Sequence, residues 1–128
     1  MIFDTDVLIW VQRGNLHAAK VVDQARERFV SVQTYLELLQ CAQNKRQIDV
    51  VKNYFKDFGF NLLPLTENIG HRAIIYLEQF GLSHGLRAGD AIIAATASEN
   101  NLQLLSGNAK HFQAIKGLVF KRFRPDNP

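Results

Sequence analysis

The feature that most constrains the fold is the alternation of short apolar runs with amphipathic segments along the chain. The apolar runs have the length of strands, and the segments between them repeat apolar residues with the period of a helix. Strands are expected at residues 1–3, 29–32, 61–65, 102–105 and 118–123. Helices are expected after residue 6, over 16–28, from a cap at Ser31 or Thr34 to 44, and over 47–58, 67–80 and 89–97. This alternation predicts an α/β fold with a central parallel sheet and helices on both of its faces.

Local signals mark where several helices begin and end. Gly59 and Gly81 are expected to end the helices that precede them, because glycine adopts left-handed backbone angles at low cost. The segment from Gly89 to Ala97 is apolar on every side, which predicts a buried helix with Asp90 at its N-terminus.

The composition is that of a single folded unit. With 128 residues, 47% of them hydrophobic, the chain is expected to form one domain over residues 1–128. The apolar runs are too short for a membrane span, and no signal-peptide pattern precedes the first strand. The single cysteine, Cys41, excludes an intramolecular disulfide and is expected to pack in the core. These observations together favour a cytoplasmic protein.

The formal net charge of +3 is mild, but basic residues gather near the C-terminus. Between Lys110 and Arg124 there are five Lys or Arg residues, one His and no carboxylate. Two interpretations stay open for this strip, a solvated surface and a phosphate-binding surface.

Oxygen-bearing side chains are expected to meet at one edge of the sheet. Asp4 follows the first strand, Glu37 lies in the helix after the second strand, and Asp90 begins the helix that leads into the fourth. Asn108 follows the fourth strand. In open parallel sheets, ligands bind in the crevice beyond the carboxyl ends of the strands, which is where these four residues fall.

Such a cluster needs a cation or protons, because neighbouring carboxylates repel one another. Asp and Glu oxygens suit Mg²⁺ or Mn²⁺, and Mg²⁺ keeps water molecules that can act as nucleophiles. This chemistry points to phosphodiester hydrolysis. One Cys and four dispersed His show no zinc-ligand spacing, and no glycine-rich phosphate loop is present.

Each carboxylate also has a purely structural explanation. Asp4 or Asp6 can cap the first helix, Asp90 can cap its own helix, and Glu37 can face solvent. Against this stands the alignment of Glu37 with Thr34 and Cys41, on a different side of the helix from the polar residues. That polar side carries Gln33, Gln40 and Asn44.

At this point the chain resembles the PIN domains, and more closely the VapC-type ribonuclease toxins of bacterial and archaeal toxin–antitoxin pairs. The resemblance rests on four motifs in family order: Phe3-Asp4-Thr5-Asp6-Val7-Leu8-Ile9, Ser31-Val32-x-Thr34-x-x-Glu37-Leu38, Leu86-x-x-x-Asp90-Ala91-x-Ile93-Ala94-Ala95-Thr96-Ala97 and Leu104-Leu105-Ser106-x-Asn108-x-Lys110-x-Phe112. Each motif is weak alone, and together they cover the chain.

The resemblance implies a three-layer α/β/α fold and a metal-dependent endoribonuclease that leaves 5′-phosphate and 3′-hydroxyl ends. It assigns Asp4, Glu37 and Asp90 as catalytic residues that bind Mg²⁺ or Mn²⁺. The fourth catalytic position is often Asp in the family and is Asn108 here. Because an amide is a weaker, neutral ligand, one firmly bound ion is expected.

Supporting roles follow from the same motifs. Thr34 belongs to the second motif, and Ser106 stands where the family usually has Thr, which keeps a hydroxyl able to bond a carboxylate or a phosphate. Asp6 either orients Asp4 or the metal waters, or caps the helix. His111 stands where the family often has Asp, so its role is open between a phosphate contact and a plain surface residue.

The resemblance also implies partners. These are an RNA substrate (tRNA, rRNA or mRNA), a small antitoxin that covers the acidic site, and a second copy of the chain in a homodimer. Lys110, His111 and Arg122 are candidates for holding the RNA backbone. Trp10 can stack on a base, although a core or dimer-interface position is the favoured interpretation.

Two rival functions remain. One is a non-catalytic PIN-like domain that binds RNA or protein through a metal site weakened by Asn108. The other is a Mg²⁺-dependent receiver domain, which needs an Asp after the third strand. That strand ends in Leu63-Pro64-Leu65-Thr66 here, which argues against a receiver.

Overall fold

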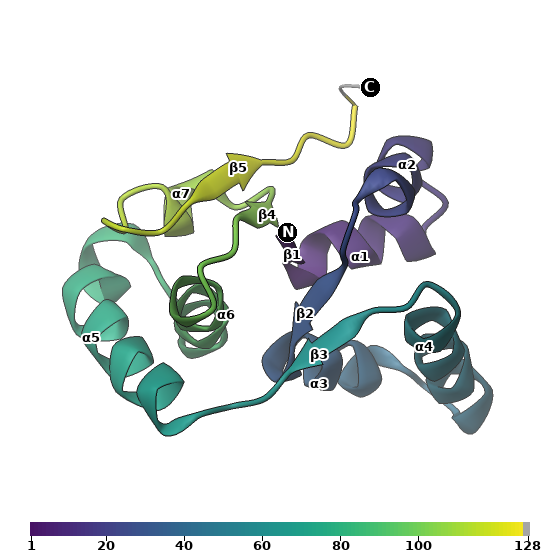
Figure 1. Cartoon of the computed structure of the whole chain (residues 1–128), viewed down its shortest axis with the longest axis horizontal. Coiled ribbons are helices and arrows are strands. Elements are labelled where there is room, and N and C mark those ends of the chain that lie inside the picture. The colour runs from purple at the N-terminus through teal and green to yellow at the C-terminus, as the bar shows by residue number, and fades with distance from the viewer. Residues whose placement is uncertain (127–128) are drawn as a thin grey trace.

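A five-stranded parallel sheet forms the centre of the molecule in the computed structural model, which describes residues 1–126 (Figure 1). The strands are β1 (Ile2–Phe3), β2 (Phe29–Ser31), β3 (Asn61–Leu63), β4 (Leu104–Ser106) and β5 (Phe120–Arg122). The helices are α1 (Thr5–Gln12), α2 (Leu16–Gln24), α3 (Val32–Cys41), α4 (Lys45–Asp57), α5 (Glu67–His84), α6 (Ala88–Glu99) and α7 (Ala109–Phe112). The predicted α/β fold is confirmed.

The strand order β3-β2-β1-β4-β5 places the first strand in the middle of the sheet. The chain moves outward from β1 through β2 to β3, and then crosses to β4 and β5 on the other side. The direction of winding therefore reverses between β1 and β4. In doubly wound folds this reversal opens a crevice at the carboxyl ends of the two strands.

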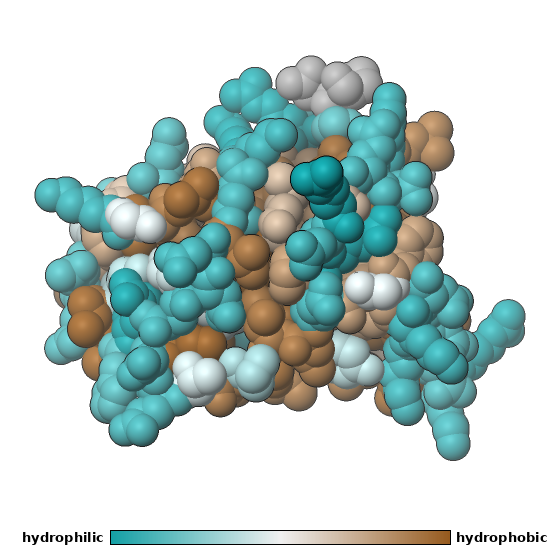
Figure 2. Space-filling view, viewed as in Figure 1, coloured by the Kyte–Doolittle hydropathy of each residue, from teal (hydrophilic) through white to brown (hydrophobic). Residues whose placement is uncertain are grey.

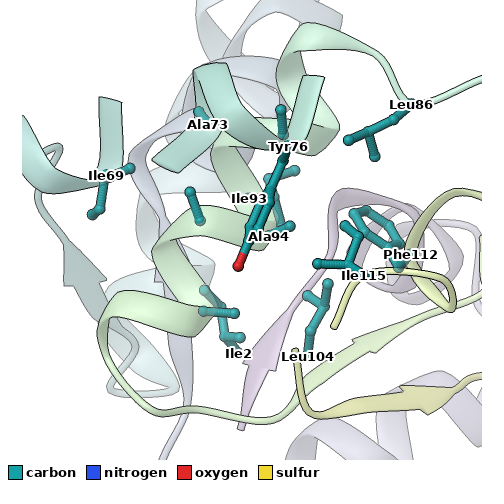
Figure 3. Close-up of a cluster of buried hydrophobic side chains, with 13 residues drawn as sticks. Ile2, Ile69, Ala73, Tyr76, Leu86, Ile93, Ala94, Leu104, Phe112 and Ile115 are labelled. Atoms are coloured by element: carbon teal, nitrogen blue, oxygen red, sulfur yellow. The ribbon is translucent and has the colours of Figure 1, made fainter. Parts of the chain in front are cut away.

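Two hydrophobic cores lie on the two faces of the sheet, because successive strand residues point to opposite sides. Ile2 belongs to the core beneath α5, α6 and α7, whereas Phe3 belongs to the core beneath α1 to α4. Figure 1 shows these two groups of helices on either side of the strands, and Figure 3 shows Tyr76, Ile93 and Leu104 converging in the first core. The result is the three-layer α/β/α arrangement.

Several element bounds differ from the sequence expectation. The helix expected over 16–28 ends at Gln24, and the strand expected over 61–65 ends at Leu63. The helix expected to stop at Gly81 continues to His84 and ends at Gly85, because Gly85 adopts the left-handed conformation (φ +68°). Glycine ends a helix only where the chain takes that turn. The four-residue helix α7 was not expected.

The expectation that Cys41 packs in the core is wrong. Its side chain is exposed at the last residue of α3, beside a groove lined by Leu38 and Val50. The helix face that Thr34 and Leu38 bury ends before Cys41, because α3 terminates there.

Polar side chains cover most of the surface, but hydrophobic side chains reach it in the middle of the face that Figure 2 shows. The exposed apolar residues include Leu62 on the edge strand β3 and Ile74 on α5. Within the described part of the chain, no helix has the length and apolar character needed to cross a bilayer.

Candidate active site

Asp4 occupies the crevice between β1 and β4. It directly follows β1, and its Oδ1 caps α1 by accepting a hydrogen bond from the Thr5 amide (2.7 Å). Its Oδ2 accepts a hydrogen bond from the Ser106 hydroxyl at the end of β4 (2.6 Å). The carboxylate is only 3% exposed. The structural role expected for Asp4, helix capping, and its place at the strand edge are therefore combined in one side chain.

Asp6 lies in the first turn of α1 and reaches toward β4. Its Oδ2 accepts a hydrogen bond from the Gly107 amide (2.8 Å), so Asp4 and not Asp6 is the helix cap. Its Oδ1 is buried and has no hydrogen-bond partner. A Cβ atom at position 107 would lie 2.8 Å from Asp6 Oδ2, so this approach requires glycine.

The electrostatics of the crevice oppose negative charge. Burial raises the pKa of Asp4 to about 8, and the charges of Asp6 and Asp90 add to this increase against the opposing effect of the Ser106 and Thr5 hydrogen bonds. Burial likewise raises the pKa of Asp6. Burial and neighbouring negative charges disfavour the charged form of a carboxylate, and a nearby cation favours it.

Glu37 enters the site from α3 through a chain of hydroxyls. The Thr5 hydroxyl donates to Glu37 Oε1 (2.6 Å) and lies 3.0 Å from Thr34 Oγ1. Thr34 Oγ1 in turn lies 3.2 Å from the Ser31 hydroxyl, and Ser31 caps α3 through the Thr34 amide. The alternative in which Thr34 caps this helix is excluded.

The polar face of α3 also reaches the site, contrary to the expectation that Glu37 is separate from it. At Gly89 a Cβ atom would lie 3.0 Å from Gln33 Nε2 and 3.2 Å from Glu37 Oε2. Gln33 and Glu37 therefore both pack against the first turn of α6. The absence of a side chain at Gly89 allows this approach.

Asp90 completes the group from α6. It is the third residue of the helix, not its cap; the cap residue is Arg87, whose amide donates to Asp90 Oδ2 (3.2 Å). His111 Nδ1 lies 2.9 Å from the same oxygen, without the angle of a hydrogen bond. The side chains of His111 and Asp90 are 26% and 17% exposed. His111 is thus partly exposed beside Asp90, and its role as a phosphate contact stays a prediction.

The remaining candidates lie at the rim of the crevice. Asn108 is exposed, and its backbone N–H donates a hydrogen bond to Ser106 Oγ (3.0 Å). Ser106 therefore links Asn108, the fourth predicted site position, to Asp4. Lys110 and Arg122 are exposed. Trp10 is partly buried against the second core.

The comparison with protein families matches the PIN domain model to residues 1–118. The chain belongs to the PIN domain family. The domain end expected at residue 128 remains a prediction.

Among related PIN domain proteins, ribonuclease VapC10 of Mycobacterium tuberculosis is 31% identical over 122 residues, covering 92% of this chain and 90% of the relative. A toxin–antitoxin complex from Klebsiella pneumoniae contains a chain of 26% identity, with a TM-score of 0.79 and coverage of 97% and 96%. VapBC2 from Rickettsia felis, bound to a DNA fragment from its promoter, has the same fold at 18% identity (TM-score 0.76, coverage 97% and 100%). The resemblance to VapC-type PIN domains is confirmed.

A divalent ion fits the acidic residues of this PIN domain by charge and by ligand chemistry. Asp6 Oδ1 is buried without a partner, and Asp4 is surrounded by other carboxylates. Within residues 1–126, however, no three Asp, Glu, His or Cys side chains are arranged to hold an ion as they stand. Glu37 is hydrogen-bonded to Thr5, and Asp90 contacts His111.

Four residues of the site escaped the sequence analysis. Thr5 holds Glu37, Gln33 lies beside Glu37, and Gly89 and Gly107 allow close approach of acidic side chains. All four directly adjoin a predicted site residue in the sequence, but adjacency alone does not show which side chains meet. Their roles depend on which helices and strands pack together.

Proposed function

We propose that this chain is a metal-dependent endoribonuclease that hydrolyses RNA phosphodiester bonds, the toxin of a VapC-type toxin–antitoxin pair. The observation that carries the proposal is the convergence of Asp4, Asp6 and Asp90 at the switch point of the sheet, where burial first, and then the charges of Asp6 and Asp90, raise the pKa of Asp4 to about 8. Membership of a family that includes ribonuclease VapC10 supports RNA as the substrate.

We assign Asp4, Glu37 and Asp90 as ligands of one Mg²⁺ or Mn²⁺ ion, with Asn108 as a weak fourth position. Such an ion lowers the pKa of a bound water molecule and polarises the phosphate. Ser106 fixes the orientation of Asp4 through a buried hydrogen bond, and Thr5 does the same for Glu37. Asp6, held by the Gly107 amide, directs its free Oδ1 into the crevice as an acceptor for water.

Basic residues near the acids are assigned as phosphate contacts. Lys110 lies on α7, which follows β4 in the sequence, and Arg122 lies on β5, which pairs with β4. His111 lies beside Asp90. The positive charges of Lys110 and Arg122 favour the RNA backbone where the acids alone would repel it.

The proposed partners follow from relatives of the chain. A small antitoxin is supported by the Klebsiella pneumoniae structure, which is a toxin–antitoxin complex. A homodimer is proposed from the family resemblance alone. We propose that its RNA target is a tRNA, an rRNA or an mRNA. An enzyme that acts on these RNAs is expected in the cytoplasm.

The deciding experiment is a cleavage assay with the purified chain, freed of co-purifying protein, on mixed RNA that includes tRNA. Reactions contain Mg²⁺, Mn²⁺ or EDTA. Discrete cleavage is expected only with metal, and Asp4→Asn and Asp90→Asn are expected to abolish it. Asp49→Asn, an exposed carboxylate on α4, serves as the matched control and should cleave like wild type.

The competing function is a non-catalytic PIN-like domain that binds RNA or protein. Two observations favour it: Asn108 is exposed and carries a neutral amide, and no three Asp, Glu, His or Cys side chains within residues 1–126 are arranged around an ion position. It predicts RNA binding without cleavage, equal in wild type and in the Asp4→Asn and Asp90→Asn variants. That result would replace the nuclease proposal.

A further inference from the structure

A groove runs from the acidic crevice toward the C-terminal segment of the chain. Asp6, Gly107 and Asn108 line its inner end. Trp10, Arg122, Arg124, Pro125 and Asp126 are among the other residues that line it. The groove therefore includes residues of the acidic crevice and also residues that are not proposed as metal ligands.

Strand pairing sets the position of Arg122. In the parallel ladder between β4 and β5, Arg122 is the partner of Ser106, whose hydroxyl holds Asp4. The Phe123 amide continues the ladder by donating to the Ser106 carbonyl (2.9 Å). Because paired residues of adjacent strands project to the same face, Arg122 lies directly beside the acidic crevice.

The segment after β5 is fixed at two points, so Arg124 belongs to a formed wall. Before Arg124, the buried Phe123 stacks on His17 of α2 with ring centres 5.3 Å apart. After it, the Asn15 side-chain amide donates to the Pro125 carbonyl (3.0 Å). Figure 1 shows this segment running from β5 toward α2.

Trp10 supplies an aromatic surface in the same groove. It is partly buried against the core, which limits its movement, and the Arg13 guanidinium lies 5.9 Å from its ring centre. Aromatic rings next to basic residues are the usual platform for unpaired bases of single-stranded nucleic acids. In a duplex the bases are stacked inside and cannot reach such a ring.

Charge favours a phosphate backbone here. Arg122 and Arg124 line the groove and are exposed, and the exposed Arg13 lies next to Trp10. The opposing charge among the outer lining residues is that of Asp126. The charge of Asp6 belongs to the acidic crevice, where the proposed cation balances it.

On the basis of the proposed ribonuclease function, we propose that this groove binds an unpaired nucleotide adjacent to the cleaved phosphate of single-stranded RNA. Its base stacks on Trp10, and its phosphate is held by Arg122 and Arg124. Asn15 is a positioning residue that keeps Arg124 in the wall.

The single tryptophan of the chain makes the base contact directly measurable. Trp10 fluorescence is followed in the Asp90→Asn variant with Mg²⁺, so that binding is observed without cleavage. A single-stranded RNA octamer is expected to quench the emission saturably, and an RNA duplex at equal phosphate concentration to leave it unchanged. Trp10→Leu in the otherwise wild-type enzyme is expected to raise KM about tenfold.

The phosphate contacts are tested by the salt dependence of octamer binding, measured by anisotropy of a labelled strand. Arg124→Gln is expected to reduce the slope of log K against log salt by about 0.7, the value for one contact to a single strand. Arg46→Gln, an exposed arginine on α4, should leave the slope unchanged. Asn15→Ser keeps a helix-capping side chain without added charge and is expected to raise KM without lowering kcat.

The outcomes separate the two proposals. Cleavage by wild type with unchanged Trp10 emission would overturn the groove proposal alone and leave this surface to a protein contact. Equal quenching by duplex and single strand would overturn the assignment to unpaired RNA. If wild type fails to cleave any RNA and the octamer also leaves Trp10 emission unchanged, both proposals fail, whereas quenching without cleavage supports an RNA-binding groove on a non-catalytic domain.

Discussion

The two halves of the acidic site differ in how deeply they are built into the fold. Asp4 is buried between the two central strands, with both oxygens bonded to groups of the sheet and the first helix. Asp90 and Asn108 stand at the rim, where solvent reaches them and His111 is the nearest partner of Asp90. In the buried half the charged form of Asp4 is disfavoured, which raises its pKa. In the rim half the side chains are accessible to solvent and can change partners. Substitutions in the two halves should therefore affect stability differently even where they affect catalysis alike.

The largest expected effect is the loss of cleavage in Asp4→Asn and Asp90→Asn, about 10³-fold or more for each, because removing a metal ligand forfeits several kcal/mol of stabilisation. Because Asp4 is buried and Asp90 lies at the rim, only Asp4→Asn is expected to raise the Tm of the metal-free protein. This substitution removes a buried negative charge that the charges of Asp6 and Asp90 disfavour. Thermal unfolding at pH 8 in EDTA measures this. An equal Tm change in both variants would contradict the division between a buried and a rim half.

Next in size is Gly107→Ala. The new methyl group would lie 2.8 Å from Asp6 Oδ2 and must displace it, so cleavage should fall about 10- to 100-fold and stability by about 1–3 kcal/mol. Gly70→Ala on α5 is the matched control, because its Cβ meets open space. There the helix should gain about 0.5–1 kcal/mol, measured by urea unfolding. Wild-type activity in Gly107→Ala would show that Asp6 has no part in the reaction.

The pH dependence of stability is the third test. Because the pKa of Asp4 is raised to about 8, the folded chain keeps a proton that the unfolded chain, with an ordinary Asp pKa near 3.8, releases. Stability of the metal-free protein should therefore fall as pH rises from about 4 to 8 and level off above. Asp4→Asn should flatten this fall, so that the Tm difference between variant and wild type grows by about 10 °C or more across the range. A pH-independent difference would show that Asp4 keeps an ordinary pKa.

The smallest effect is expected at the rim. Asn108→Asp adds a carboxylate where the family often has one, and because the position is exposed the cost in stability should stay below about 0.5 kcal/mol. We expect the Mg²⁺ concentration for half-maximal cleavage to fall a few-fold. A metal titration of cleavage rates checks this. A large loss of stability would mean that Asn108 belongs to the buried half after all.

Much of this molecule follows from local sequence signals. The alternation of apolar runs and amphipathic segments predicts the parallel sheet, since strands and helices have different periods of side-chain burial. The position of Asp4 directly after a buried strand predicts its place at the sheet edge. The sequence does not show which glycine ends a helix. Both Gly81 and Gly85 follow the predicted helix, and only Gly85 adopts the left-handed conformation that ends α5.

The fold class, the family and the acidic residues at the carboxyl edge can all be predicted from the sequence, because periodicity and short motifs act over neighbouring residues. The groups that hold those acids became known from the packed structure. Thr5 bonds Glu37 across 32 positions, and Ser106 bonds Asp4 across 102. The packed structure also decided that Cys41 is exposed and that Trp10 and Arg124 share a groove. Such contacts depend on how helices and strands pack against one another, which no local pattern encodes.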